Sequence, residues 1–196
     1  MYQRIKKDTK WSIKHLGFCD IKMIKAEVSN FSDEWLLNTT RQNHGLVHTN
    51  TEMFRICSTP YEWTPDLEIV TTYENSLKTK EAQEELDKLF NYLEERYCGK
   101  VIRCEIIKLH ANSEVHKHVD AGPLLNFSRR VHIPIITNKD VTFTVFNNTI
   151  HMEEFGIYEI NNMLPHAVSN KSSEDTTHLI IDILPDDMLN YTKLGE

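Results

Sequence analysis

The chain has 196 residues, of which 40% are hydrophobic and 26% are charged, and its formal net charge is −7. This length suffices for one sizeable core, and the composition is that of a globular protein rather than of a disordered one. No basic block is longer than Lys6-Lys7 or Arg129-Arg130, so the charge argues against nucleic acid as a partner.

The N-terminal stretch MYQRIKKDTKWSIKHLGF lacks the continuous apolar run of a signal peptide, and no apolar run elsewhere approaches membrane-spanning length. Cys19, Cys57, Cys98 and Cys104 form no C-x-x-C pair, so they are expected to be packing residues rather than disulfides or zinc ligands. We therefore expect a cytoplasmic protein without a membrane partner. The sequence leaves its oligomeric state open.

The first hundred residues predict a mixture of strands and helices. Residues 19–28 alternate like a strand, and residues 30–45 predict a helix with Ser32 as its N-cap and Gly45 at its end. Residues 46–57 predict a second strand.

A proline-punctuated loop covers residues 58–68, and its aromatic residues Tyr61 and Trp63 suggest a lid over a substrate. The clearest helix is predicted over residues 79–98, where apolar residues recur at helical spacing and Gly99 follows as a C-terminal stop.

The second half predicts closely spaced short strands, which are typical of a sandwich or barrel. Their sequences are VIRCEIIKL, RRVHIPII, VTFTVF, TIHME, GIYEIN and HLIIDIL. We expect one domain over residues 1–196, of the α+β class and mainly β. A mixed α/β part at 1–100 would buttress a cupin-like jelly roll, a double-stranded β-helix, at 101–185.

The segment VHKHVD places His118 and Asp120 two positions apart, and such side chains share one face of an extended strand. His166 lies 48 residues downstream and is the candidate for the third ligand. Two imidazoles and one carboxylate are the facial set of non-haem Fe(II) oxygenases. Zinc hydrolases also use this set, but no general-base glutamate stands beside these residues. A single histidine on a strand is more often an ordinary core or surface residue than a metal ligand. His116 is expected to lie near the entrance of the metal site or behind the metal ligands.

Four elements in order make the second half resemble a known family: H-x-D, then R-V-H-I-P, then P-H-x-V-x-N, then an apolar strand that ends at Asp182. Over residues 101–184 the sequence resembles the aspartyl/asparaginyl β-hydroxylases, which are Fe(II)/2-oxoglutarate oxygenases and include free-proline hydroxylases.

The resemblance implies that His118, Asp120 and His166 are the iron ligands and the catalytic centre. It also implies that Arg130 and His132 meet the carboxylate of 2-oxoglutarate near the metal, for which a guanidinium fork is suited. Packing alone would also place these two side chains together on one strand face.

The sequence departs from the family at one position. An arginine is expected at the start of the last strand, where it would hold the distal carboxylate of 2-oxoglutarate, but Thr176 stands there. Threonine offers one hydrogen bond and no charge. The candidates to replace the arginine are Arg103, Lys108, Arg129 and His178, and we favour His178 because it shares a strand face with Thr176.

The resemblance thus implies an Fe(II)- and 2-oxoglutarate-dependent dioxygenase that hydroxylates an amino acid, free or in a peptide, and releases succinate and CO2. Ascorbate is expected to sustain the activity. The alternative is a non-catalytic cupin-like module that binds a small molecule or a metal, and Thr176 favours it. A zinc hydrolase on the same barrel is the third possibility.

Overall fold

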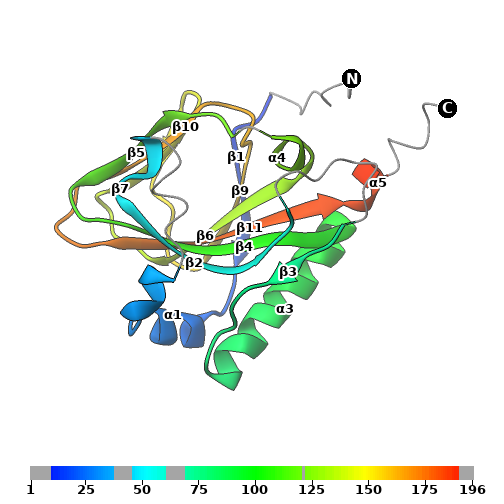
Figure 1. Ribbon diagram of the computed structural model, residues 1–196. Helices are drawn as coiled ribbons and strands as arrows, with labels where there is room; N and C mark the ends of the chain where they lie inside the picture. Colours follow the sequence, from blue (N-terminus) through cyan, green and yellow to red (C-terminus); the bar gives the residue numbers. More distant parts are fainter. Residues whose placement is uncertain (1–9, 38–45, 61–68, 121, 190–196) are drawn as a thin grey trace.

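The computed structural model describes residues 10–37, 46–60, 69–120 and 122–189, and Figure 1 shows two sheets with the two longest helices on one side. The large sheet has the order β1-β9-β6-β11-β4-β2-β3, and the small sheet has the order β5-β10-β7-β8. The strands are β1 Ile13–Phe18, β2 Thr51–Ser58, β3 Thr72–Tyr73, β4 Gly99–Leu109, β5 Ser113–His118, β6 Arg129–Ile136, β7 Val141–Val145, β8 Asn148–Ile150, β9 Gly156–Ile160, β10 His166–Asn170 and β11 Thr176–Pro185. The helices are α1 Lys22–Val28, η1 Asp33–Leu36, η2 Leu46–His48, α3 Lys80–Tyr97, α4 Pro123–Phe127 and α5 Asp186–Leu189.

From β4 onward the chain passes back and forth between the two sheets, apart from the pair β7–β8, which stays in the small sheet. Strands β4, β6, β9 and β11 lie in the large sheet, and β5, β7, β8 and β10 lie in the small one. All pairings within this set are antiparallel. This is a double-stranded β-helix, or jelly roll, and it confirms the predicted fold class. Helices α1 and α3 cover the outer face of the large sheet (Figure 1).

The two faces of the large sheet have different compositions because side chains alternate along each strand. The outer face is apolar and forms the main core with the helices. Its residues include Ile106, Val131, Ile133, Leu179 and Ile181, which pack with Leu86 and Leu93 of α3. The inner face points toward the small sheet and carries most of the polar residues described below.

The prediction of a strand at residues 19–28 was wrong, because residues 22–28 form helix α1. Ile21, Ile24 and Val28 are buried at helical spacing, whereas Met23, which a strand would have buried, is 41% exposed. The Glu85 carboxylate accepts hydrogen bonds from the backbone N–H groups of Met23 and Ile24 at 3.0 Å. A partner from α3 therefore satisfies donors at the start of this short helix.

The helix predicted over residues 79–98 is confirmed as α3, and Thr79 is its N-cap. Cys98, rather than Gly99, adopts the left-handed conformation that ends the helix, with φ of 45°. Gly99 instead begins β4, where a Cβ atom would collide with the Leu184 carbonyl of β11.

Of the helix predicted over residues 30–45, the described part contains only the short 3-10 helix η1, and residues 38–45 lie outside the described residues. The suggested lid residues Tyr61 and Trp63 also lie outside them. The strand predicted over residues 46–57 is β2, preceded by the 3-10 helix η2.

The four cysteines are free thiols. Cys57 and Cys104 are buried, as packing residues are, whereas Cys98 is exposed. Within the described ranges, no helix is both long enough and apolar enough to span a membrane.

Candidate metal centre

The three predicted ligands meet at one end of the small sheet. His118 is the last residue of β5 and faces His166, the first residue of β10, across the antiparallel pair. Asp120 follows two positions after β5 ends. His118 Nε2 lies 3.9 Å from Asp120 Oδ1, and His166 Nε2 lies 3.7 Å from Asp120 Oδ2. One ligand atom from each residue lies within 4.8 Å of the other two.

Backbone carbonyl groups orient both imidazole rings. His118 Nδ1 lies 2.7 Å from the His116 carbonyl oxygen, and His166 Nδ1 lies 3.0 Å from the Leu164 carbonyl oxygen. Because a carbonyl oxygen only accepts hydrogen bonds, each Nδ1 carries the proton and donates it. In a neutral imidazole, Nε2 then keeps its lone pair. The fold therefore presets the tautomer that a metal ligand requires.

This donor set fits a divalent transition-metal ion. Nitrogen and oxygen ligands at about 2.0–2.2 Å from one ion are about 3 Å apart when they bind at right angles. The two distances from Asp120 to the histidines, 3.7 and 3.9 Å, exceed that value by less than 1 Å, so a small side-chain rotation brings the three ligands to one ion. Two imidazoles and a carboxylate on one side leave coordination positions open, as in non-haem iron sites.

A row of alternating charges runs from Asp120 across the inner face of the large sheet. Arg130 Nη1 donates to Asp120 Oδ2. The Nε–Nη2 edge of Arg130 binds Asp182 in a fork, at 2.8 Å to Oδ1 and 3.0 Å to Oδ2. Arg103 Nε reaches Asp182 Oδ2 from the other side at 2.6 Å. The register explains the row, because Asp182 on β11 is paired with Arg130 on β6 and with Arg103 on β4.

Arg103 is a permanent cation in this row. Burial lowers its pKa, but the nearby carboxylates of Asp182, Glu105 and Asp120 outweigh that effect and hold the pKa above its ordinary value. Asp182 is fully buried and accepts hydrogen bonds from two guanidinium groups. Such pairing is what a buried charge requires.

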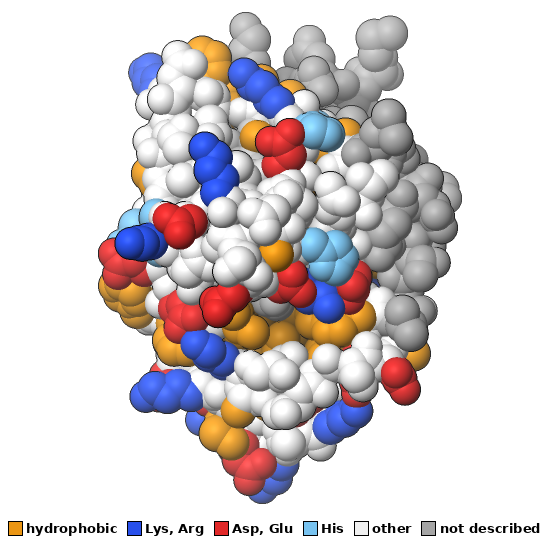
Figure 2. Space-filling view, turned by 90° about the vertical axis from the view of Figure 1, so that its left-hand side faces the viewer, with side chains coloured by type: hydrophobic (Ala, Val, Ile, Leu, Met, Phe, Trp, Pro, Cys, Tyr) orange, Lys and Arg blue, Asp and Glu red, His pale blue; other side chains and the backbone are white. Residues whose placement is uncertain are grey.

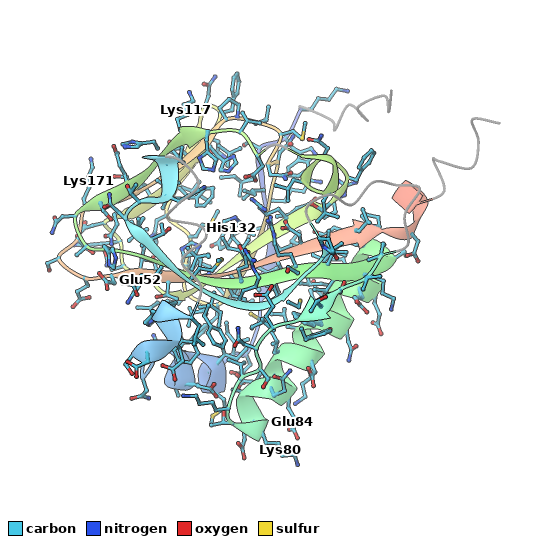
Figure 3. All side chains as sticks on the ribbon, in the orientation of Figure 1. Glu52, Lys80, Glu84, Lys117, His132 and Lys171 are labelled. Atoms are coloured by element: carbon cyan, nitrogen blue, oxygen red, sulfur yellow. The ribbon has the colours of Figure 1, made fainter. Side chains whose placement is uncertain are left out.

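A cavity of about 710 Å³ lies beside the three ligands, between the two sheets. Its wall includes the inner face of the large sheet and residues of β5, β7 and β10. Figure 3 shows His132 in the space between the sheets, whereas Lys117 of β5 projects away from it. On the side of the molecule seen in Figure 2, hydrophobic side chains line a recess bordered by acidic, basic and histidine side chains.

His132 and His178 both line this cavity. Their ring centroids are 5.9 Å apart, and the His132 ring meets Phe143 edge-on at 4.9 Å. Burial, with a smaller effect from His151, lowers the pKa of His178 to about 4, so this ring is neutral at pH 7. His178 Nε2 has no hydrogen-bond partner among the described residues.

Thr176 also lines the cavity, on the same face of β11 as His178. Its hydroxyl group donates to the Ile136 carbonyl oxygen at 2.8 Å, so it is already tied to the neighbouring strand. The other residues considered as replacements for the expected arginine are Arg103, Lys108 and Arg129, and they lie on different faces of the large sheet. Arg103 lines the cavity.

Lys108 and Arg129 point to the outer face of the sheet. Lys108 Nζ stands 4.6 Å from the centroid of Trp35, which belongs to the core beneath the helices. Arg129 Nη1 lies 3.6 Å from Glu159. These two cations are therefore separated from the cavity by the sheet itself.

Three further ionisable residues that line the cavity were not foreseen from the sequence: His48, Arg55 and Glu105. Arg55 on β2 and Glu105 on β4 form a partly buried ion pair at 2.9 Å. Arg103 and Glu105 stand two positions apart in an otherwise apolar strand, which was an available signal of an inward-facing polar row. His48, whose ring meets that of His118 edge-on at 5.1 Å, carries no local sequence signal.

His116 lies outside the site. Its side chain is 60% exposed and its ring pairs with Glu114 at 3.0 Å, while its backbone carbonyl orients the His118 ring.

The jelly roll and the two histidines with one aspartate define a class of protein, the cupin-like folds with a candidate metal centre at one end of the small sheet. A sequence model of the aspartyl/asparaginyl β-hydroxylases matches residues 20–185. The chain belongs to this family, as the resemblance indicated.

Solved structures share this fold at low sequence identity. An oxidoreductase of the 2OG-Fe(II) oxygenase family from Burkholderia pseudomallei has a TM-score of 0.57 and 13% identity, over 84% of this chain and 77% of that one. AviO1 from Streptomyces viridochromogenes has a TM-score of 0.54 and 10% identity, over 88% and 89%. The viral collagen prolyl hydroxylase of Paramecium bursaria Chlorella virus-1, as its 2OG complex, has a TM-score of 0.52 and 12% identity, over 90% and 97%. No curated protein sequence matches the chain.

Proposed function

We propose that this protein is an Fe(II)- and 2-oxoglutarate-dependent dioxygenase that hydroxylates an amino acid, free or in a peptide, and releases succinate and CO2. The observation that carries the proposal is the convergence of His118, Asp120 and His166 beside the cavity, with both Nδ1 atoms bound to backbone carbonyls. Family membership supports the same reaction class.

In this proposal, Nε2 of His118, Nε2 of His166 and one oxygen of Asp120 hold Fe(II). When bound, iron and 2-oxoglutarate together supply the oxidising chemistry for hydroxylation. The chain's own contribution is placement. It fixes the imidazole tautomers, holds the carboxylate through Arg130, and provides a cavity in which a C–H bond can be held beside the metal.

We assign 2-oxoglutarate to the part of the cavity lined by His132 and His178. His178 Nε2 is a buried polar atom without a partner among the described residues, and such atoms are costly unless a ligand or water satisfies them. Arg130 lies between this region and Asp120. Its described contacts use three of its five N–H groups, which leaves donors for an oxygen of the cosubstrate near the metal.

The volume of the cavity supports a small-molecule or peptide substrate. At about 710 Å³ it lies within the range of about 300–1,000 Å³ that is usual for such sites. This is room for the cosubstrate and for one amino-acid side chain or a free amino acid. The family description, aspartyl/asparaginyl β-hydroxylase, supports the amino-acid class.

The test is succinate release from 2-oxoglutarate with Fe(II), ascorbate and a panel of free amino acids and peptides. Wild-type protein is expected to release succinate, most rapidly with its true substrate, and His118→Ala is expected to fall to background. Wild-type protein that binds iron but never converts 2-oxoglutarate, with or without an added substrate, would contradict the proposal.

A second candidate is a non-catalytic module that binds a metal or small molecule, and Thr176 in place of a cation favours it. This candidate predicts saturable metal or ligand binding without succinate. A zinc hydrolase is less well supported, because Glu105, a cavity glutamate, is held by Arg55 at 2.9 Å and is not available as a base.

A further inference from the structure

The row Asp120–Arg130–Asp182–Arg103 connects a predicted metal ligand to the middle of the large sheet. Asp120 stands beyond the last residue of β5, so strand pairing does not fix its side chain. Its neighbours His118 and His166 are strand residues whose rings are held by the backbone. The carboxylate of Asp120 instead takes its position from a side chain, Arg130.

Arg130 is itself fixed on two sides. Its Nε–Nη2 edge forms a fork with Asp182, and this leaves Nη1 directed at Asp120 Oδ2. Asp182 is fully buried and is also bound by Arg103 of β4, the strand on the other side of β11 from β6. A bidentate fork restricts both the distance and the plane of the guanidinium group. The orientation of Asp182 therefore fixes that of Arg130, and Arg130 in turn fixes the position of the Asp120 carboxylate.

We propose that Asp182 and Arg130 form a positioning device for the metal site, which binds Asp120 Oδ2 and thereby presents Oδ1 to the ion. Arg103 completes the device by fixing Asp182. This inference rests on the proposed metal site. It assigns to Asp182, whose carboxylate is bound by Arg130 and Arg103, a measurable effect on metal affinity.

A buried ion pair could instead serve only to hold the sheet together, and the chain offers a matched control for that role. Glu159 is 97% buried in the same sheet, pairs with Arg129 at 3.6 Å and lies on the outer face, away from the cavity. Glu159→Gln removes a buried carboxylate charge next to an arginine, as Asp182→Asn does, without touching the row that ends at Asp120.

The experiment measures Co(II) binding to the full-length apoprotein by calorimetry, together with the visible absorption spectrum of the Co(II) complex and thermal unfolding without metal. Removing a partner behind a metal ligand typically weakens metal binding about 10–100-fold. We expect a loss of that size in Asp182→Asn and in Arg130→Lys, since a lysine can hold one carboxylate but not two. The Co(II) spectrum should also change. Glu159→Gln should bind Co(II) as wild type does, even where its Tm falls.

The proposal is overturned if Asp182→Asn or Arg130→Lys folds and binds Co(II) with wild-type affinity and spectrum, or if Glu159→Gln loses as much affinity as they do. Should Asp182→Asn fail to fold, Arg130→Lys and Arg103→Gln decide the matter in the same way. Wild-type protein that binds no Co(II) or Fe(II) would instead refute the proposed function, so the two failures are distinguishable.

Discussion

Thr176 occupies the position at which the family resemblance predicts an arginine, and its surroundings show what the change means for the cavity. The side chain is almost fully buried, and its hydroxyl donates to the Ile136 carbonyl. His178, two positions along the same strand face, is neutral at pH 7 because its pKa is lowered to about 4. Thr176 and His178 therefore bring no positive charge to this part of the cavity.

Restoring the cation is expected to strengthen cosubstrate binding. We predict that Thr176→Arg binds 2-oxoglutarate about fivefold more tightly than wild type, because hydrogen bonds from a charged donor are worth about 1 kcal/mol more than neutral ones. Calorimetric titration with 2-oxoglutarate, with Co(II) in place of Fe(II), measures the effect.

Thr176→Met is the control, since it adds length without charge and should not tighten binding. If the arginine variant binds no more tightly than the methionine variant, the distal carboxylate does not reach this end of the cavity.

How far these residues could be predicted depended on how local their signal is. His118 and Asp120 could be predicted as candidate ligands because H-x-D is a local pattern, and His166 because the P-H-x-V-x-N motif marks it; the structure brings the three side chains together. Arg55 and His48 were missed because they reach the cavity only through long-range strand pairing and packing, which no local pattern encodes. Similarly, the sequence showed that Arg103 was a candidate cation but not that Asp182 would bind it.

At the scale of elements, α1 shows how a tertiary contact overrides a local pattern. Its seven residues, Lys22–Val28, are too few for a stable isolated helix, and alternation over residues 19–28 favoured a strand. Two tertiary contacts stabilise the helical conformation instead. Ile24 and Val28 are buried against α3 and the large sheet, and the Glu85 carboxylate binds the N–H groups at the start of the helix. The longer α3 was predictable because its own apolar periodicity suffices.

This contact gives a prediction about stability. Glu85→Ala leaves the N–H groups of Met23 and Ile24 without their carboxylate, and loss of a helix cap costs about 1 kcal/mol. In a chain of this size, that corresponds to a fall in Tm of about 2–4 °C.

The control is Glu84→Ala. Glu84 is half exposed, and the pair it forms with Lys80 is an exposed one, so its loss should change the free energy of unfolding by at most about 0.5 kcal/mol. Thermal unfolding of both variants checks the difference, and equal Tm values for Glu84→Ala and Glu85→Ala would show that Glu85 does not stabilise α1.

At the scale of the whole molecule, the large sheet separates the apolar core on its outer face from the polar cavity on its inner face. Its outer face is a conventional apolar core covered by helices, and its inner face carries charges and imidazoles around the cavity. The fold class was predictable because many short strands follow one long amphipathic helix. The difference between the apolar outer face and the polar inner face could not be predicted, because it depends on the order in which the strands pair. The polar inner face makes the stability of the whole fold sensitive to pH, and His178 allows this sensitivity to be measured.

The direction of the pH dependence of stability follows from the pKa of His178 in the folded and in the unfolded chain. The unfolded chain takes up a proton near pH 6.5, whereas the folded chain does so only near pH 4, so the unfolded state binds more protons between these values. The contribution of His178 to stability is therefore complete above pH 6.5 and is lost as the pH falls toward 4, at about 1.4 kcal/mol per pH unit and about 3 kcal/mol in all. We predict this loss for wild type relative to His178→Phe, which keeps a ring of similar size beside His132 and Phe143.

The measurement is the free energy of unfolding in urea from pH 7.5 to 4, without metal, for both proteins. All other ionisable groups are common to both proteins, so their effects largely cancel in the difference. Above pH 6.5 the difference should be constant, and below it wild type should lose stability against the variant. Parallel curves over the whole range would show that His178 is protonated as readily in the folded protein as in the unfolded chain, and the neutral, buried ring assigned to the cosubstrate region would then be wrong.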